Sequence, residues 1–99
     1  MSPKIRVLGR AQRDLDQIYD YALRETPPRA DRFIEELLDA IESLETMPER
    51  GAIPRDEVLR RRGYRYLIHK PYLVLYKLVK QQVRVYRVLH GSRAYRGLL

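Results

Sequence analysis

Residues 64–90 read YRYLIHKPYLVLYKLVKQQVRVYRVLH and contain three runs rich in aromatic and β-branched residues. The runs cover Tyr64–His69, Tyr72–Val79 and Val83–His90, and short polar segments separate them. In the middle run both alternating sets of side chains are largely apolar, which is typical of a strand covered on both faces. We therefore expect three strands, with the middle run at the centre of the sheet.

The last run has a break in its alternation. Val83 and Val85 share one parity, whereas Val88 has the other. Because side chains alternate between the two faces of a strand, Val88 would point away from the core in a regular strand. A β-bulge near Tyr86-Arg87 would return Val88 to the core face, and we expect one there.

Two helical patterns precede these runs. Apolar residues recur on one helix face from Ala11 to Glu25, and a stronger pattern of the same kind runs from Pro28 to Met47. Thr26-Pro27-Pro28 separates the helices because proline disfavours a helix interior, and Thr26 is the expected N-cap of the second helix. Pro48 then ends that helix. The two helices should form an antiparallel hairpin.

The amino-terminal segment Lys4-Ile5-Arg6-Val7-Leu8 alternates polar and apolar residues and predicts a further strand. The order is then β-α-α-β-β-β, an α+β fold in which the helical hairpin packs on a small antiparallel sheet. The length of 99 residues fits one domain over residues 1–99. The expected core packs one face of the second helix on two strands: Ile34, Leu37, Leu38 and Ile41 against Leu73, Leu75, Val83 and Val85.

Charge is divided unevenly along the chain, whose net charge is +7. Residues 1–54 carry 8 Lys and Arg against 11 Asp and Glu, whereas residues 55–99 carry 12 against 2. Six of the eight tyrosines and both histidines also lie in the basic half. A basic surface rich in tyrosine suits an acidic protein or a nucleic-acid backbone, although a solvated surface that maintains solubility is the alternative.

Several kinds of site find no support in the sequence. The chain has no cysteine, His69 and His90 are 21 residues apart, and the glycines do not fit a phosphate-binding loop. We therefore expect no metal and no cofactor. Asp14, Asp16 and Asp20 are interpreted as a solvated helix face. No apolar run has the length of a signal peptide or membrane helix, so we expect a cytoplasmic protein without membrane contact.

Arginine is the most abundant candidate binding residue in the basic half. Its planar donors suit phosphates or carboxylates, and the candidates are Arg60, Arg61, Arg62, Arg65, Arg84, Arg87, Arg93 and Arg96. His90 could act as a general acid or base, although a structural histidine at a strand end is the simpler interpretation. Cleavage of RNA through its 2′-hydroxyl would need a base, an acid and a cation, and the candidates are Arg65, His90, Arg93 and Tyr95. The near absence of carboxylates after Glu57 argues against an efficient nuclease.

Six segments in sequence order carry a family resemblance: Ala11–Tyr21, Pro28-Arg29-Ala30, Leu44–Gly51, Gly63-Tyr64-Arg65, Tyr72–Tyr76 and Val88–Arg93. Together they resemble the RelE/ParE superfamily, the toxins of bacterial type II toxin-antitoxin modules. The resemblance covers nearly the whole chain. It implies a strand and helical hairpin against a small antiparallel sheet, in agreement with the patterns above.

The superfamily has two branches with different targets. The Asp14-Leu15 and Ile18–Tyr21 helix segments and the Val88–Arg93 ending resemble the ParE branch, whose members inhibit DNA gyrase by binding. RelE-like members instead cut messenger RNA on the ribosome, and Arg60–Arg62 and Tyr95 could correspond to their basic and carboxy-terminal residues. The resemblance thus implies a ParE-like gyrase inhibitor, with a ribosome-dependent endoribonuclease and a non-toxic binding module as alternatives.

The resemblance also implies a cognate ParD-like antitoxin, and any contact with promoter DNA would be made through that antitoxin. Such a segment is expected to be disordered until bound and to bring acidic side chains to the basic half. Arg93–Leu99 is the preferred contact with the target, with a frayed terminus as the alternative. The candidate target-binding or antitoxin-binding residues are Arg60, Arg61, Arg62, Arg65, Arg84, Arg87, Arg93, Tyr95, Arg96, Leu98 and Leu99.

Overall fold

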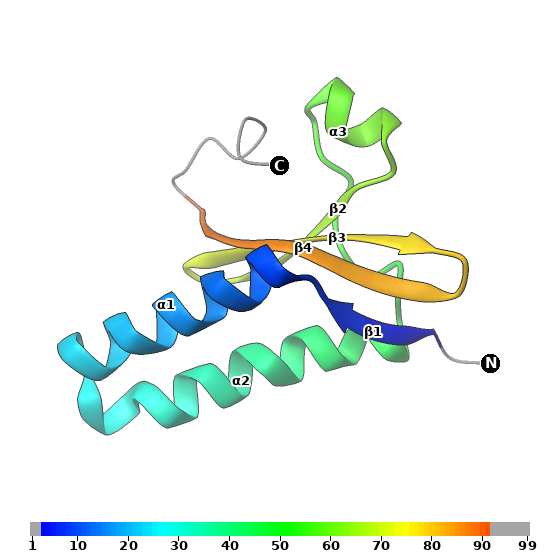
Figure 1. Cartoon of the computed structure of the whole chain (residues 1–99). Helices are drawn as coiled ribbons and strands as arrows, with labels where there is room; N and C mark the ends of the chain where they lie inside the picture. The colour runs from blue at the N-terminus through cyan, green and yellow to red at the C-terminus, as the bar shows by residue number, and fades with distance from the viewer. Residues whose placement is uncertain (1–2, 92–99) are drawn as a thin grey trace.

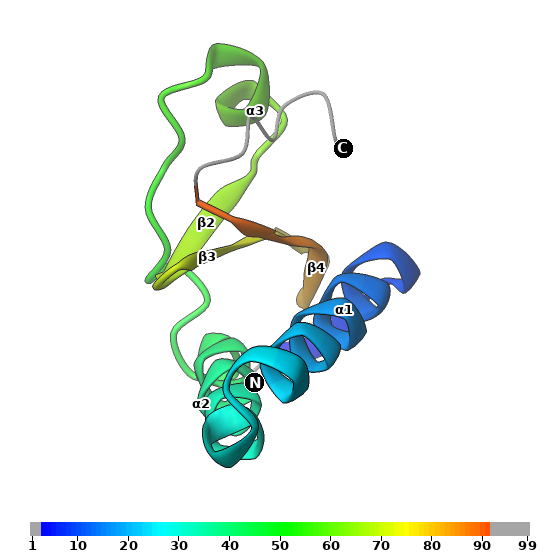
Figure 2. The same ribbon diagram turned by 90° about the vertical axis from the view of Figure 1, so that its left-hand side faces the viewer.

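The computed structural model describes residues 3–91 as a mixed four-stranded sheet with a helical hairpin on one face (Figure 1). The sheet has the order β1-β4-β3-β2 and consists of β1 (Lys4–Val7), β2 (Arg65–His69), β3 (Tyr72–Val79) and β4 (Gln82–His90). The hairpin consists of α1 (Gly9–Glu25) and α2 (Ala30–Glu42), which lie side by side below the sheet in Figure 2. The predicted α+β class and element order are confirmed.

The helix ends differ from the sequence prediction. A 3₁₀ turn at Pro27–Arg29 joins the two helices, and another at Ser43–Glu45 follows α2. The Ser43 hydroxyl donates to the Ala40 carbonyl at 2.5 Å, a side-chain bond made at the point where α2 gives way to the second 3₁₀ turn. The prediction that Thr26 caps the second helix was wrong, because its backbone N–H and hydroxyl both donate back to the Ala22 carbonyl of α1.

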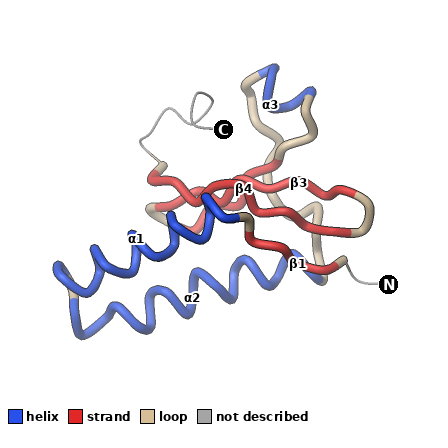
Figure 3. The backbone as a smooth tube through the Cα atoms, in the orientation of Figure 1, coloured by secondary structure: helices blue, strands red, loops and turns tan. Residues whose placement is uncertain are grey.

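Strand pairing is antiparallel except at β1. β2 pairs with β3 and β3 with β4 in antiparallel register, whereas β1 runs parallel to β4 (Figure 3). The expectation of an all-antiparallel sheet was therefore incomplete. Parallel strands need a long crossover connection, which the rest of the chain supplies between β1 and β4. As a result both β3 and β4 are internal strands.

The predicted bulge is confirmed. Leu75 pairs with Arg87 and Tyr76 pairs with Val85, so Tyr86 is the extra residue of β4. The bulge changes the parity of β4, and Val88 is buried in the same cluster as Val83 and Val85.

The predicted core contained the wrong residues at two places. Leu37 is fully buried, but its neighbour Leu38 is 42% exposed because adjacent residues lie about 100° apart around a helix. In β3 the helix-facing core residues are Val74 and Tyr76, and the alternating position Leu75 is buried on the opposite face. The core comprises Ala11, Leu15, Ile18, Leu37, Ile41, Leu44, Leu67, Val74, Tyr76, Val83, Val85 and Val88.

A short third helix, α3 (Glu57–Arg61), lies on the side of the sheet away from the hairpin (Figure 2). The sequence prediction had only a charged stretch here. The Asp56 carboxylate accepts a hydrogen bond from the Leu59 N–H at 3.0 Å, a standard N-cap, and Leu59 is buried beneath the helix. None of the helices described in residues 3–91 has the length and apolarity needed to cross a bilayer.

Candidate functional site

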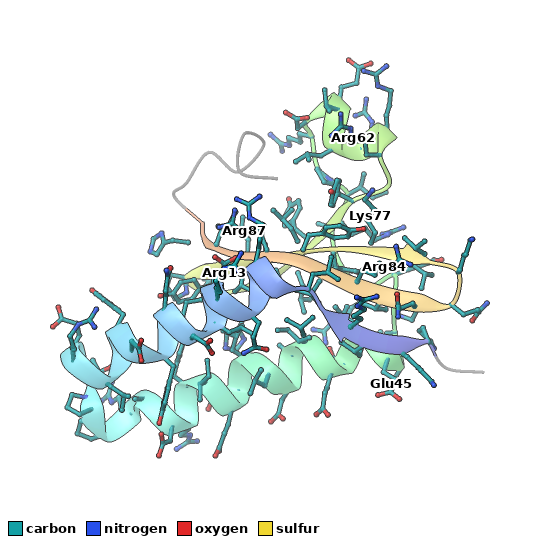
Figure 4. All side chains as sticks on the ribbon, viewed as in Figure 1. Arg13, Glu45, Arg62, Lys77, Arg84 and Arg87 are labelled. Carbon is teal, nitrogen blue, oxygen red and sulfur yellow. The ribbon has the colours of Figure 1, made fainter. Side chains whose placement is uncertain are left out.

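The sheet face opposite the helical hairpin, called here the open face, carries three cations in register. Arg6 on β1 is directly opposite Arg84 on β4, and Arg84 is directly opposite Lys77 on β3. Figure 4 labels Lys77 and Arg84 on these neighbouring strands. We call Arg6, Arg84 and Lys77 the cation row. The four strands contain no Asp or Glu, so no strand residue on either face balances this charge.

Lys77 is held in place by two tyrosines. Its ammonium nitrogen lies 4.4 Å from the centroid of the Tyr64 ring and 5.4 Å from that of Tyr86. The two rings meet edge to face, with centroids 5.3 Å apart. Burial raises the pKa of the Tyr64 hydroxyl, so that group stays neutral and adds no negative charge beside Lys77. Cation–π contact therefore positions this member of the row without neutralising it.

Arg87 occupies a buried ion pair with Asp14 (Figure 4 labels Arg87 above α1). Its Nε and Nη2 donate to the two carboxylate oxygens at 2.7 and 2.9 Å, and the Val88 N–H donates to the same carboxylate at 2.9 Å. Both side chains are only 10% exposed. The hydrogen bonds that Arg87 donates to Asp14 raise the pKa of Arg87, because they stabilise the charged guanidinium.

The interpretation of Asp14 as part of a solvated helix face was wrong. Asp14 follows Ala11 by three residues and precedes Ile18 by four, so it lies on the buried face of α1. Its carboxylate also has a structural task there, because β1 ends at Val7 and leaves the remaining edge of β4 without a strand partner. Asp14 satisfies the Val88 N–H on that edge.

Arg65, a candidate catalytic and binding residue, fastens the connection after α2. Its Nη1 donates to the carbonyls of Glu49 and Gly51 at 3.2 and 3.0 Å. The buried Tyr76 hydroxyl donates to the Pro48 carbonyl at 2.7 Å and accepts from the Gly51 N–H at 2.9 Å. A Cβ atom at Gly51 would lie 2.5 Å from this hydroxyl, so only glycine fits. These contacts indicate a structural role for Arg65.

His90 lies on the other side of the molecule from the cation row, at the end of β4. Its ring packs edge to face on Tyr72 with centroids 5.7 Å apart. Together with residues of α1 it lines a hollow of about 180 Å³ formed by Asp14, Gln17, Ile18, Tyr21, Tyr72, Val88, Leu89 and His90. His90 is exposed at the rim and accessible to a partner.

Of the four ribonuclease candidates, the two within the described residues, Arg65 and His90, lie far apart. Arg65 and His90 pair with Tyr76 and Tyr72 of β3, from opposite sides of that strand. Four residues along a strand span about 13 Å, and the two strand spacings between them add about 9–10 Å across the sheet. Arg93 and Tyr95 lie outside the described residues, as do the binding candidates Arg96, Leu98 and Leu99.

The arginines of the α3 region are exposed. Arg60 and Arg61 belong to α3 and Arg62 follows it, and Arg61 pairs loosely with Glu57 at 3.9 Å. Within residues 3–91, no group of His, Asp and Glu side chains is arranged to hold a metal ion. The open face presents guanidinium, ammonium and aromatic groups from Arg6, Arg84, Lys77, Tyr64 and Tyr86.

Comparison with known proteins identifies the family. The family model described as the ParE toxin of the type II toxin-antitoxin system parDE matches residues 5–95. The chain belongs to the ParE toxin family. This confirms the resemblance to the RelE/ParE superfamily and its ParE-like branch. A comparison with curated proteins gives no match.

Two solved structures share the ParE fold of this chain. The chromosomal ParDE toxin-antitoxin system from P. aeruginosa matches with a TM-score of 0.76 and 21% identity, covering 90% of this chain and 96% of the other. The toxin-antitoxin complex RelBE2 from Mycobacterium tuberculosis matches with a TM-score of 0.66 and 23% identity, covering 91% and 99%. Both likenesses support the α+β fold of this chain.

Burial of Tyr76 predicts a loss of stability at alkaline pH. Burial raises the pKa of Tyr76 above its ordinary value of 10.0, so its contribution is complete below pH 10 and declines as the pH rises through the folded-state value. Tyr76→Phe should be less stable at neutral pH by about 1–3 kcal/mol, because the Gly51 N–H loses its partner. Its stability should then fall less steeply above pH 10. Urea unfolding of both proteins from neutral pH to above pH 10 measures both effects. If the stability of the two proteins falls equally with pH, the titration of Tyr76 is not the cause of the loss.

Proposed function

We propose that this ParE family protein acts in the cytoplasm as a toxin that inhibits DNA gyrase by binding, and that a cognate ParD-like antitoxin neutralises it. The family match over residues 5–95 is the observation that carries the proposal. The geometry supports binding over catalysis, because Arg65 is committed to the Glu49 and Gly51 carbonyls and lies far along β3 from His90.

The experiment that tests the proposal supplies the purified protein to two assays. One measures supercoiling by gyrase, and the other maps cuts in messenger RNA during translation. We expect inhibited supercoiling and no cuts positioned at codons. Codon-positioned cuts with normal supercoiling would overturn the proposal and favour the RelE-like endoribonuclease. Normal supercoiling and uncut messenger would favour the non-toxic binding module.

His90→Ala sharpens this distinction. A general acid or base contributes about 100-fold or more to a cleavage rate, so the variant would lose cleavage if His90 were catalytic. A binding surface spreads its contacts over many residues, and one exposed side chain at its rim changes affinity little. We therefore expect His90→Ala to inhibit supercoiling within a few-fold of the unsubstituted protein. A 100-fold loss of messenger cleavage in the translation reaction would instead assign a chemical role to His90.

A further inference from the structure

Among the described residues, no carboxylate compensates the charge of the cation row. Neighbouring strands lie about 4.8 Å apart, and like charges directly opposite each other destabilise a sheet. Arg84 is at the centre of the row and faces a like charge on each side. Its Nε donates to the neutral Gln82 side chain at 2.6 Å, and within residues 3–91 no carboxylate pairs with Arg6, Arg84 or Lys77.

The surroundings of the row suit carboxylates better than nucleic acid. Single-stranded nucleic acids bind largely by stacking bases on exposed aromatic rings. Here Tyr64 is buried, its ring meets Tyr86 edge to face, and Lys77 lies over both rings, so neither ring offers an open stacking platform. Affinity for duplex DNA depends largely on the number of phosphates that a protein neutralises, and the three cations of the row can neutralise about three.

We infer that the cation row binds a stripe of carboxylates along one face of a partner helix. Side chains three or four positions apart on a helix have Cβ atoms about 5–6 Å apart, close to the strand spacing of about 4.8 Å. Three acidic residues at successive helical turns can therefore lie over Arg6, Arg84 and Lys77 in order. The inference rests on the proposed function in one respect: the partner that presents this helix is the antitoxin.

Binding is tested with a synthetic alanine-rich helical peptide that carries Glu at three positions spaced by four. One control peptide has Gln at those positions, and another has the three Glu on different helix faces. Fluorescence anisotropy with the full chain should show binding of the striped peptide, at least about tenfold weaker binding of both controls, and weakening with salt. Equal binding of the striped and scattered peptides would overturn the inference, because binding would then depend only on general basicity.

Charge-reversal variants locate the peptide on the row. Arg84→Glu should weaken binding of the striped peptide at least about tenfold, since it removes the central cation and adds repulsion. Arg24→Glu is the matched control, because it makes the same charge change at an exposed position in the last turn of α1. We expect that control to bind within about twofold of the unsubstituted chain. Equal losses of peptide affinity in Arg84→Glu and Arg24→Glu would show that the peptide does not bind at the cation row.

Stability provides a readout that binding alone does not. Arg84→Glu turns two repulsive cross-strand pairs into attractive ones and should raise the Tm by at least about 2 °C. A lower Tm with intact secondary structure would contradict the premise that the row is uncompensated. If Arg84→Glu does not fold, Arg6→Glu on the exposed edge strand β1 replaces it and changes one cross-strand pair, Arg6 with Arg84. If Arg6→Glu binds the striped peptide as tightly as the unsubstituted chain does, the inference is overturned.

The last experiment measures binding of a DNA duplex and of a single-stranded oligonucleotide to the full chain. Tighter binding of either one than of the peptide, lost in Arg84→Glu, would reassign the row to nucleic acid and overturn the inference. None of these measurements uses gyrase. Peptide binding with normal supercoiling would therefore refute the proposed function alone, and inhibited supercoiling without peptide binding would refute the cation-row inference alone.

Discussion

Asp14→Ala should lower the free energy of unfolding by about 3–5 kcal/mol, because it leaves the Arg87 charge buried without its carboxylate. The Val88 N–H on the free edge of β4 loses its acceptor in the same variant. Denaturant unfolding measures this loss. Asp20→Ala is the matched control at an exposed position of the same helix and should change stability by no more than about 0.5 kcal/mol.

The double variant Asp14→Ala with Arg87→Met separates charge from packing. It removes the buried guanidinium along with its partner, so it should recover a large part of the loss. If the double variant is less stable than Asp14→Ala alone, the ion pair is not the cause of the loss. Equal effects of Asp14→Ala and Asp20→Ala would contradict the buried placement altogether.

Leu37→Ala should cost about 2–5 kcal/mol, whereas Leu38→Ala should cost less than about 1 kcal/mol. The two leucines are adjacent in α2, but Leu37 is fully buried in the core and Leu38 is 42% exposed. The two variants remove the same atoms from the same turn of the helix, so they differ only in whether a buried cavity is created. Thermal melts of the two variants provide the comparison, and equal Tm values would show that the helix face has been assigned wrongly.

The helices and strands were predictable because each repeats a physical pattern over several residues. The bulge was predictable as well, because Val88 breaks the alternation that Val83 and Val85 establish. The face of β3 was not predictable, since its two alternating sets are both apolar and only the pairing with β4 selects Val74 and Tyr76 for the core. Similarly, the parallel pairing of β1 depends on contacts with the far end of the chain.

The sequence predicted a basic binding surface, but it did not predict which basic side chains lie next to one another. The uneven division of charge and the family resemblance follow directly from the sequence, and the family match confirms the resemblance. The cation row could not be found in the same way, because Arg6, Arg84 and Lys77 come from three strands and become neighbours only through strand register. The burial of Asp14 could have been predicted from the sequence, since its spacing from Ala11 and Ile18 places it on the apolar face of the helix.

The position of β4 within the sheet has a consequence for the synthesis of this protein. Lys4 of β1 pairs with Gln82 of β4, 78 positions later in the chain. The first strand therefore cannot pair until nearly the whole chain has been translated. Until β4 leaves the ribosome, Asp14 has no Arg87 to pair with and Arg84 is missing from the cation row. An interrupted nascent chain therefore cannot assemble this face of the sheet. The sheet can therefore be completed only after its last strand, β4, has been translated.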